Sequence, residues 1–340
     1  MADVGRLAGV SHQTVSRVVN GSLHVRPETR RRVLEAMQTL GYRPNPLARG
    51  LVTGRSNTLG VVSFDTTLYG PASTLLGIER AAHEAGYFIV IASLKALNRA
   101  SVADAVERLS LQGVDGILVI APLQSAAEAL LDAPQRLPLV AVEAGPGDSI
   151  PVVEVDQFAG AADATRHLLD LGHETVWHLA GPSDFLESER RVSGWRATLE
   201  AAGAEPPPVY VGDWSARAGY DLGRRLAADR SVSAVFVAND QMALGVLRAM
   251  HEAGRAVPRE VSVVGFDDIP EAGYFSPPLT TVRQDFDEIG ARSLQLLVRE
   301  IETGRRQPSA PRVRPELIVR ASTSVAPPRA SVGNTPVRAG

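Results

Sequence analysis

The sequence contains no cysteine and only one lysine, Lys95, in 340 residues. The lack of cysteine excludes disulfides, thiolate catalysis and cysteine-ligated zinc. No apolar run reaches the roughly 18 residues that a membrane helix needs. The first residues, MADVGRLAG, also lack the apolar stretch of a secretory signal. We therefore expect a cytoplasmic protein without a membrane anchor.

Motifs of common enzyme classes are absent as well. The sequence has no G-x-G-x-x-G, no Walker A loop, no G-x-S-x-G elbow and no H-E-x-x-H helix. His167, His173, His178 and His251 do not have the spacing of metal ligands. We expect neither a cofactor nor a metal, and a protein that is not an enzyme.

Positive charge is concentrated at one end of the chain. Residues 1–55 carry nine arginines and three acidic residues, a net charge of +6. Because the whole chain has a net charge of −3, the remaining residues carry −9. A basic segment attached to an acidic body indicates a polyanionic partner for that segment alone.

Three helical patterns fill the basic segment. Residues 3–9, 13–20 and 27–40 repeat apolar side chains at helical spacing, and Ser11 is suited to cap the second helix. Two short helices joined by a tight turn, followed by a third, form a helix-turn-helix, whose second helix enters the major groove of DNA. The alternative is a small helical bundle with a solvated polar face. The Gly-Val-Ser turn and the local positive charge favour DNA binding.

The second of these helices carries side chains that suit DNA. Gln13 can pair with adenine and Arg17 with guanine through two hydrogen bonds each. Thr14 and Ser16 can hold phosphates without reading sequence. We therefore interpret this helix as the recognition helix.

From residue 57 onward, short apolar runs alternate with alanine-rich amphipathic segments. This alternation predicts strands joined by helices, and hence doubly wound parallel sheets in two lobes. The chain is expected to cross between the lobes near residues 154–156, 283–285 and 308–312. The runs are LGVVSF, YFIVIAS, GILVIAP, LPLVAVE, TVWHLAG, PVYVGDW, AVFVAND and VSVVGFDD. The predicted boundaries are 57–155 with 285–312 for the first lobe, 156–283 with 313–325 for the second, and 326–340 for a disordered tail.

Ligands of open parallel sheets bind beyond the carboxyl ends of the strands. Carboxylates and amides at these positions pair well with hydroxyls, and an aromatic face covers the C–H surface of a sugar ring. The pattern therefore favours a neutral polyol over a phosphate. The residues that follow the predicted strands are Asp65, Pro122, Glu143, Asp156, Asp213, Trp214, Asn239, Asp240, Asp267 and Asp268.

Several of these residues have a structural alternative. Trp214 could belong to the core, although its place at a strand end favours the pocket. Asp267 or Asp268 could cap the following helix, and Asp240 is as suited to a helix cap as to a ligand contact. Asp267 with Glu143 could also imitate the carboxylate pair of a glycosidase, but a binding protein needs the same groups for hydroxyls.

The basic segment resembles the DNA-binding part of the LacI/GalR family of regulators. DVGRLAGVSHQTVSRVVNGS follows the family pattern V-A-x-x-A-G-V-S-x-x-T-V-S-R-V-x-N, and LGYRPNPLARGL follows L-G-Y-x-P-N-x-x-A-R-x-L. The resemblance implies a helix-turn-helix domain over 1–44 and a hinge helix over 45–56 that is ordered only on DNA. In the helix-turn-helix domain, the resemblance implies DNA contacts from His12, Gln13, Thr14, Ser16, Arg17 and Asn20. In the hinge helix, it implies DNA contacts from Asn45, Leu47, Ala48 and Leu51, with Leu51 as a minor-groove wedge.

The body also resembles this family. GDWSARAGY, VANDQMALG, VSVVGFDD and SPPLTTVRQDF resemble its regulatory domain, which has the fold of periplasmic sugar-binding proteins. The resemblance implies ligand contacts from Leu68, Pro71, Glu143, Arg191, Trp214, Asn239, Asp267, Gln284 and Phe286. Glu143 stands where galactoside-responsive members carry the shorter Asp, so its side chain is expected to crowd or redirect the pocket.

Membership of this family implies a homodimeric repressor of sugar-utilisation genes on a pseudo-palindromic operator. A small sugar would release it, with a galactoside as the first candidate and a glucoside or another plant-derived disaccharide as the second. Two alternatives are a regulator that uses its ligand as corepressor, and a sugar receptor of a transport system, which has no use for residues 1–55. Dimer surfaces are expected on the first lobe, including the helix over 71–85. The tail has prolines and no leucine after Leu317, so the leucine-heptad segment that makes tetramers is not predicted.

Overall fold

The computed structural model describes residues 1–19, 22, 24–42, 55–94, 98–123, 125, 137–144 and 150–328. Most of the predicted hinge and tail lies outside these ranges. The predicted DNA contacts Asn20, Asn45, Leu47, Ala48 and Leu51 also lie outside the described residues.

The N-terminal residues form the predicted helix-turn-helix. The helices are α1 (Ala2–Ala8), α2 (His12–Val19) and α3 (Pro27–Thr39). Ser11 caps α2, because its hydroxyl accepts the backbone N–H of Thr14 at 3.2 Å. The three helices share a small core of valine and alanine: Val4, Ala8, Val15, Val18, Val33 and Ala36.

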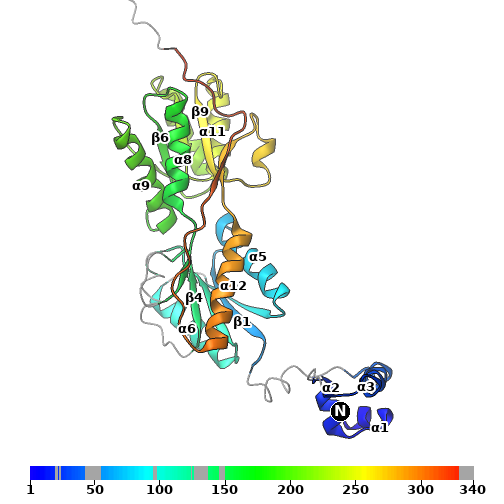
Figure 1. Ribbon diagram of the computed structural model, residues 1–340. Helices are drawn as coiled ribbons and strands as arrows, with labels where there is room; N and C mark the ends of the chain where they lie inside the picture. Colours follow the sequence, from blue (N-terminus) through cyan, green and yellow to red (C-terminus); the bar gives the residue numbers. More distant parts are fainter. Residues whose placement is uncertain are drawn as a thin grey trace, which may run out of the picture.

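The first lobe is built on a five-stranded parallel sheet in the order β2-β1-β3-β4-β5 (Figure 1). Helices α5 and α12 pack against one face and α6 packs against the other. The strands are β1 (Thr58–Phe64), β2 (Phe88–Leu94), β3 (Gly116–Ile120), β4 (Leu139–Val142) and β5 (Val152–Val153), and the helices are α5 (Tyr69–Glu84), α6 (Arg99–Leu111) and α12 (Phe286–Thr303).

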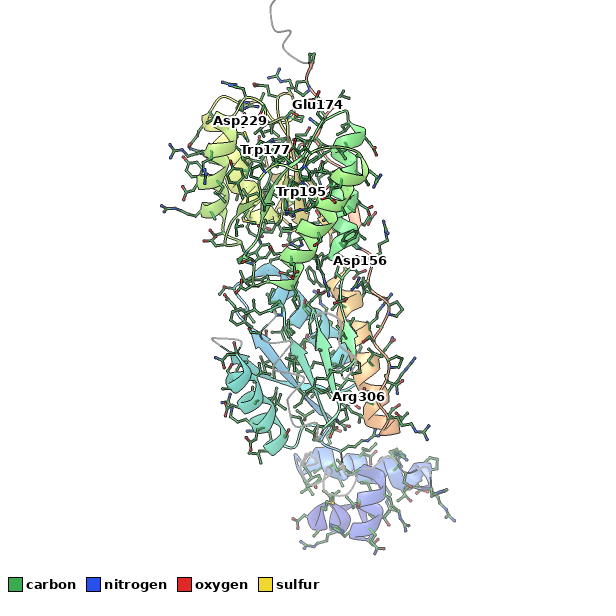
Figure 2. The ribbon with its side chains drawn as sticks, turned by 90° about the vertical axis from the view of Figure 1, so that its left-hand side faces the viewer. Asp156, Glu174, Trp177, Trp195, Asp229 and Arg306 are labelled. Carbon is green, nitrogen blue, oxygen red and sulfur yellow. The ribbon has the colours of Figure 1, made fainter. Side chains whose placement is uncertain are left out.

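The second lobe has six strands in the order β11-β10-β9-β8-β6-β7. Helices α8 and α9 cover one face of the sheet, and Trp195 of α9 lies in the interior of this lobe (Figure 2). Helices α10 and α11 cover the other face. The strands are β6 (Trp177–Ala180), β7 (Tyr210–Val211), β8 (Ala234–Val237), β9 (Ser262–Asp267), β10 (Thr280–Arg283) and β11 (Glu316–Ile318). The helices are α8 (Gln157–Asp170), α9 (Leu186–Ala201), α10 (Ala216–Ala228), α11 (Asp240–Glu252) and the short 3₁₀ helix η1 (Ala272–Tyr274).

All eight predicted apolar runs contain a strand, which confirms the predicted architecture of two doubly wound lobes. Three short strands were not predicted: β5, β10 and β11. Strand β11 pairs antiparallel with β10, so the second sheet is mixed rather than purely parallel. The chain enters β11 directly from its third crossing between the lobes. Because no helix carries it across the sheet first, it runs antiparallel to β10 at the sheet edge.

The chain passes between the lobes after β5, after β10 and before β11 (Figure 1). Val155 and Val313 form an isolated parallel bridge, so the first and third crossings run side by side. Figure 2 shows Asp156 of the first crossing at the waist between the lobes. The Glu154 carboxylate accepts hydrogen bonds at 2.6 Å from Arg190 on α9 and from Arg312 on the third crossing. Among the described residues, no helix is long and apolar enough to span a membrane.

Candidate nucleic-acid interface and ligand cavity

Helix α2 presents a polar outer face. His12, Gln13 and Arg17 are exposed, whereas Thr14 and Ser16 are half-buried. Val15 and Val18 anchor the opposite face in the core of the three helices. The helix therefore holds its exposed residues on a fixed support, as base reading in a groove requires.

The three consecutive arginines of α3 also shape the domain. The Arg32 guanidinium donates to the carbonyl oxygens of Ala8 and Gly9, where α1 ends. Arg30 donates to the carbonyl of Ser22 at 2.6 Å. Arg31 instead forms an exposed ion pair with Glu35 at 3.0 Å. Part of the positive charge of the segment thus fixes the positions of α1 and α3.

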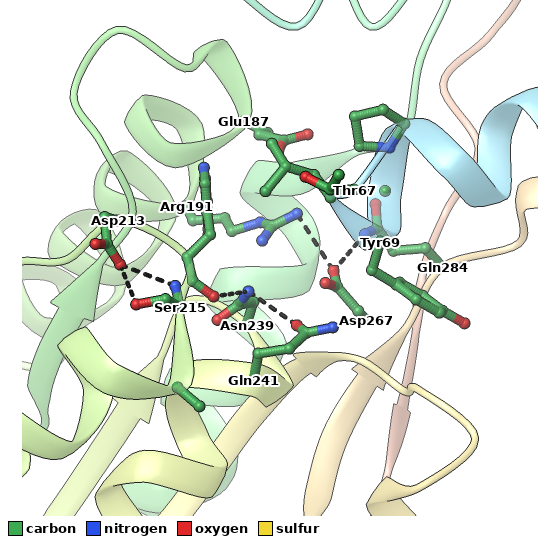
Figure 3. Close-up of a pocket in the computed structure, with 15 residues that line it drawn as sticks. Thr67, Tyr69, Glu187, Arg191, Asp213, Ser215, Asn239, Gln241, Asp267 and Gln284 are labelled. Carbon is green, nitrogen blue, oxygen red and sulfur yellow. Dashed lines mark hydrogen bonds and ion pairs between the residues drawn. The ribbon is translucent and has the colours of Figure 1, made fainter. Parts of the chain in front are cut away.

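A cavity of about 290 Å³ lies between the two lobes (Figure 3). The first lobe contributes the loop after β1 and the start of α5. The second lobe contributes α9, the loop after β7, the start of α11, and the ends of β9 and β10. Seven of the nine predicted ligand contacts line it: Leu68, Pro71, Arg191, Trp214, Asn239, Asp267 and Gln284.

The other two predicted contacts, Glu143 and Phe286, line a smaller adjoining cavity. The Glu143 carboxylate accepts the backbone N–H of Val155 at 2.9 Å, and this bond turns it toward the first crossing. The ring of Phe286 packs edge-on against Tyr69, with the ring centroids 5.8 Å apart. The two cavities share Gly70, Pro71, Glu187 and Gln284. The longer Glu143 side chain is therefore redirected away from the main cavity.

Three buried hydrogen bonds and one ion pair form a closed ring at the floor of the main cavity. Arg191 Nε donates to Gln157 Oε1 at 2.9 Å, and Gln157 Nε2 donates to Gln284 Oε1 at 2.8 Å. Gln284 Nε2 then donates to Asp267 Oδ1 at 2.7 Å, and this oxygen lies 3.7 Å from Arg191 Nη2. The four side chains are 1–7% exposed. The network holds the guanidinium and the carboxylate in fixed positions at the cavity wall.

Burial perturbs the acidic groups of both cavities. Burial raises the pKa of Asp267 to about 7, although the Arg191 guanidinium and the Gln284 hydrogen bond lower it. Burial and the nearby Glu187 carboxylate raise the pKa of Glu143 to about 8. The pKa of Glu187 is also raised by burial. Perturbed carboxyls in a cavity are a physical sign of a functional site.

Trp214 closes the cavity from the second lobe. Its ring packs on Gly181, where an added Cβ would lie 2.2 Å from the Trp214 ring, so only glycine fits there. The side chain is 6% exposed, and its indole N–H is buried without a hydrogen-bond partner among the described residues. A buried donor without a partner is costly, and a ligand acceptor would relieve that cost.

Asn239 acts mainly on the protein itself. Its side chain caps α11 by accepting the Met242 N–H at 2.9 Å. Its amide donates to the Trp214 carbonyl and to Gln241 Oε1, so both amide hydrogens are used. Asn239 therefore positions the backbone of Trp214 at the cavity wall.

Two structural alternatives for the aspartates are wrong. Asp240 does not cap α11. Instead it is buried and accepts hydrogen bonds from Thr281 Oγ1 and from the Ile269 N–H. Asp268 forms ion pairs with Arg283 and Arg320 rather than capping a helix. No group of His, Asp and Glu within the described part of the chain is arranged to hold a metal ion.

The backbone is strained where the strands end at the cavities. Glu143, Trp214 and Asp267 have φ angles of 58°, 72° and 107°, a region that side chains other than glycine rarely adopt. Such strain persists where the surrounding structure over-determines the conformation, and it concentrates at functional sites. All three are among the residues that directly follow the predicted strands.

Sequence reasoning missed several residues of the main cavity. The strand-end rule does not reach the first turn of a helix, where Glu187, Gln241 and the buried Gln157 lie. It also misses the loop positions one or two residues further along. The missed residues that line the cavity are Thr67, Tyr69, Gly70, Glu187, Ser215, Ala216 and Gln241.

Comparison with known proteins matches both parts of the chain. Residues 1–45 match the model of bacterial regulatory proteins of the lacI family, and residues 165–323 match a periplasmic binding protein-like domain. The chain is 34% identical to the lactose operon repressor of Escherichia coli (strain K12) over 327 residues, which cover 96% of this chain and 90% of the relative.

Solved structures agree with this match. A lac repressor dimer bound to operator and the anti-inducer ONPF superposes with a TM-score of 0.85 at 33% identity, covering 95% of this chain and 98% of the other. A complex of the transcriptional regulator CelR with cellobiose superposes with a TM-score of 0.69 at 33% identity, covering 94% and 98%. The shared fold, the helix-turn-helix and the identity over nearly the whole length show that this chain belongs to the LacI family of bacterial regulatory proteins.

Proposed function

We propose that this protein is an operator-binding transcriptional repressor whose DNA affinity is controlled by a small saccharide in the interlobe cavity. The observation that carries the proposal is the cavity itself. A fixed guanidinium–carboxylate pair, Arg191 and Asp267, lies beside a buried indole in a space between two lobes. A saccharide supplies hydroxyl acceptors and donors for these groups and a C–H face for Trp214. DNA binding would place the protein in the cytoplasm.

The DNA-binding half of the proposal rests on α2. Its exposed residues His12, Gln13 and Arg17 match the types that read base edges. The contacts predicted for Thr14, Ser16 and the hinge complete this interface. Because the two lobes both line the cavity, a ligand there would favour one interlobe geometry, and the hinge would transmit that change to the DNA-binding domain.

We also propose that the repressor works as a homodimer. Strand β2 lies at the edge of the first sheet and exposes Phe88 and Ile91, and α5 exposes Leu76. On the second lobe, Leu244 and Tyr274 are exposed. Apolar side chains at an open sheet edge are unfavourable in a monomer and suit a self-complementary interface. Sedimentation velocity at micromolar protein should give a dimer, and a tetramer would contradict the proposal.

The direct test is fluorescence anisotropy of labelled duplexes from the region upstream of the gene. The probes are a panel of galactosides, cellobiose and other plant-derived disaccharides. We expect one sugar to release the DNA, and Trp214→Ala to abolish release while DNA binding persists. A sugar that strengthens DNA binding would instead identify a corepressor. If the protein binds a sugar but binds no DNA, the result favours the alternative of a sugar receptor of a transport system.

A further inference from the structure

The main cavity has more acidic than basic side chains. Glu187 and Asp267 line it, and Glu143 lines the adjoining space. Asp213 lies at the rim, where it accepts hydrogen bonds from the hydroxyl and backbone N–H of Ser215. Arg191 is the one basic side chain among the described residues that line either cavity. Ionisation of these carboxyl groups would therefore give the cavities more negative charge than the single arginine can balance.

Arg191 cannot compensate for all of this charge, because its guanidinium is already engaged. Nε donates to Gln157 and Nη1 donates to the Ala238 carbonyl. Nη2 faces Asp267 at 3.7 Å, and the guanidinium stacks on the Phe266 ring at 3.8 Å from its centroid. Asp267 offsets the single positive charge of Arg191, so no further positive charge among the described residues of the cavity is left to offset an ionised Glu187.

Glu187 is half-buried at the cavity wall, and no hydrogen bond or ion pair joins its carboxylate to another described residue. It stands on the first turn of α9, four residues before Arg191, and both side chains therefore point from the same helix face. Figure 3 shows Glu187 and Thr67 on one side of the cavity, across from Asn239 and Gln241. The indole N–H of Trp214 is a buried polar group of this cavity without a partner among the described residues.

We propose that Glu187 selects the effector by charge, so that the cavity prefers a saccharide bearing a cationic amine over its neutral parent and rejects the corresponding uronate. This inference rests on the proposed function, because it specifies the ligand of the same cavity. A half-buried carboxylate without a partner attracts an ammonium group more strongly than a hydroxyl, because the hydrogen bond to an ammonium is charge-assisted. A second carboxylate on the ligand would add like-charge repulsion.

The carboxyl groups that face one another support this assignment. Glu187 raises the pKa of both Glu143 and Asp267 through its charge. The opposing charges near Glu187 and Glu143 are those of Arg191 and Arg190, and Arg190 is already paired with Glu154 at 2.6 Å. A bound ammonium favours the ionised carboxylates, so binding it should release protons and strengthen as pH rises from acid toward neutral.

The test uses trios of sugars that differ at one group. At C6 the galactose trio is galactose, 6-amino-6-deoxygalactose and galacturonic acid, and the glucose trio is built in the same way. Galactosamine and glucosamine place the amine at C2. Isothermal titration calorimetry of the full-length protein should show at least one amine bound roughly tenfold more tightly than its neutral parent, and the uronate bound more weakly than that parent.

Three variants separate charge at this position from other effects. Glu187→Gln should remove the preference for the amine, and Glu187→Asp should retain part of it. Glu189→Gln removes the same charge from the exposed face of α9 two residues away and should leave the preference intact. Circular dichroism of each variant checks that it is folded.

Several outcomes overturn the inference. These are a neutral parent that binds as tightly as every amine tested, no binding of any amine, or equal effects of Glu187→Gln and Glu189→Gln. If neutral disaccharides still release the DNA, the proposed function stands and only the charge selection fails. If no saccharide binds or changes DNA affinity, both fail.

Discussion

Single carboxyl groups in the cavities should make the stability of the regulatory domain depend on pH. Burial raises the pKa of Glu143 to about 8, whereas an unfolded glutamate ionises near pH 4.5. The folded state therefore keeps a proton that the unfolded state loses. The contribution of this group to stability is complete below the unfolded pKa and is lost as pH rises through about 8.

We therefore predict that Glu143→Gln is more stable than the wild-type protein at alkaline pH. The amide keeps an acceptor for the Val155 N–H but does not ionise. Relative to wild type, the variant should gain on the order of 1–3 kcal/mol at pH 8 and little at pH 5. Urea unfolding at the two pH values measures the difference. The exposed Glu84→Gln is the control, and a Glu143 variant with the pH dependence of wild type would disprove the assignment.

Residues at strand ends could be predicted, because the carboxyl ends of parallel strands meet at one edge of a sheet. Trp214 and Asp267 were found in this way. Glu187 and Gln157 were not, because each lies on the first turn of a helix, where a polar residue is ordinary. The direction of Glu143 could not be predicted either, since it depends on a hydrogen bond to a backbone amide twelve residues away.

At the scale of elements, Arg32 adds polar contacts to the apolar packing of α1 against α3. Arg32 donates to the two carbonyls at the end of α1, which otherwise lack partners at a helix terminus. We predict that Arg32→Ala lowers the local stability of α1 and α3 by about 1–3 kcal/mol. Hydrogen exchange of their amides in the full-length protein measures this change.

Arg31→Ala is the matched control on the same helix. It removes the same charge, but its ion pair with Glu35 is exposed and should contribute no more than about 0.5 kcal/mol. Both variants lose one positive charge and should weaken the electrostatic attraction to DNA equally. Because α2 packs on α1 and α3, a larger loss of DNA affinity for Arg32→Ala would show that the packing of these helices holds α2 in place for DNA binding. Equal exchange rates in the two variants would show that the carbonyl contacts of Arg32 do not matter.

Periodicity predicted the elements better than their orientation. Six of the eight strands in the apolar runs are buried, and buried parallel strands are continuous and apolar. The edge strands β2 and β7 are largely exposed but were found because their runs are also apolar. Strands β5, β10 and β11 were missed because they are two to four residues long and lie next to the crossings. In the helix-turn-helix domain, Leu7, Leu34 and Leu40 fit the helical pattern but are about half exposed. The core that the three helices share consists of small side chains, valine and alanine, and is narrower than the apolar stripe on each helix. The leucines at the edges of these stripes therefore stay partly exposed.

At the scale of the whole molecule, Glu154 links the two lobes. Its carboxylate is 7% exposed and bridges α9 to two of the three crossings. We predict that Glu154→Gln destabilises the protein by about 1–3 kcal/mol, because Arg190 and Arg312 lose their common partner. It should also separate the unfolding of the lobes into two transitions in urea, followed by tryptophan fluorescence and circular dichroism.

Asp163→Asn tests whether any ion pair near the waist has this effect. Asp163 pairs with Arg314 at 2.7 Å, but the arginine side chain is 69% exposed. Exposed pairs contribute about 1 kcal/mol or less, so a single transition close to that of wild type is expected. Two transitions in this variant as well would mean that Glu154 has no special part in joining the lobes.

The cavity and the DNA-binding face are distinct sites on one chain, and thermodynamics constrains how they can communicate. If the saccharide changes DNA affinity by some factor, DNA must change saccharide affinity by the same factor, whichever the sign. We expect a factor of about 5–150. Anisotropy with saturating sugar gives the first value, and calorimetry with saturating operator gives the second. Unequal factors would mean that DNA and sugar meet different assemblies of the protein, for example dimer and monomer, because reciprocity holds only when both ligands act on one set of states.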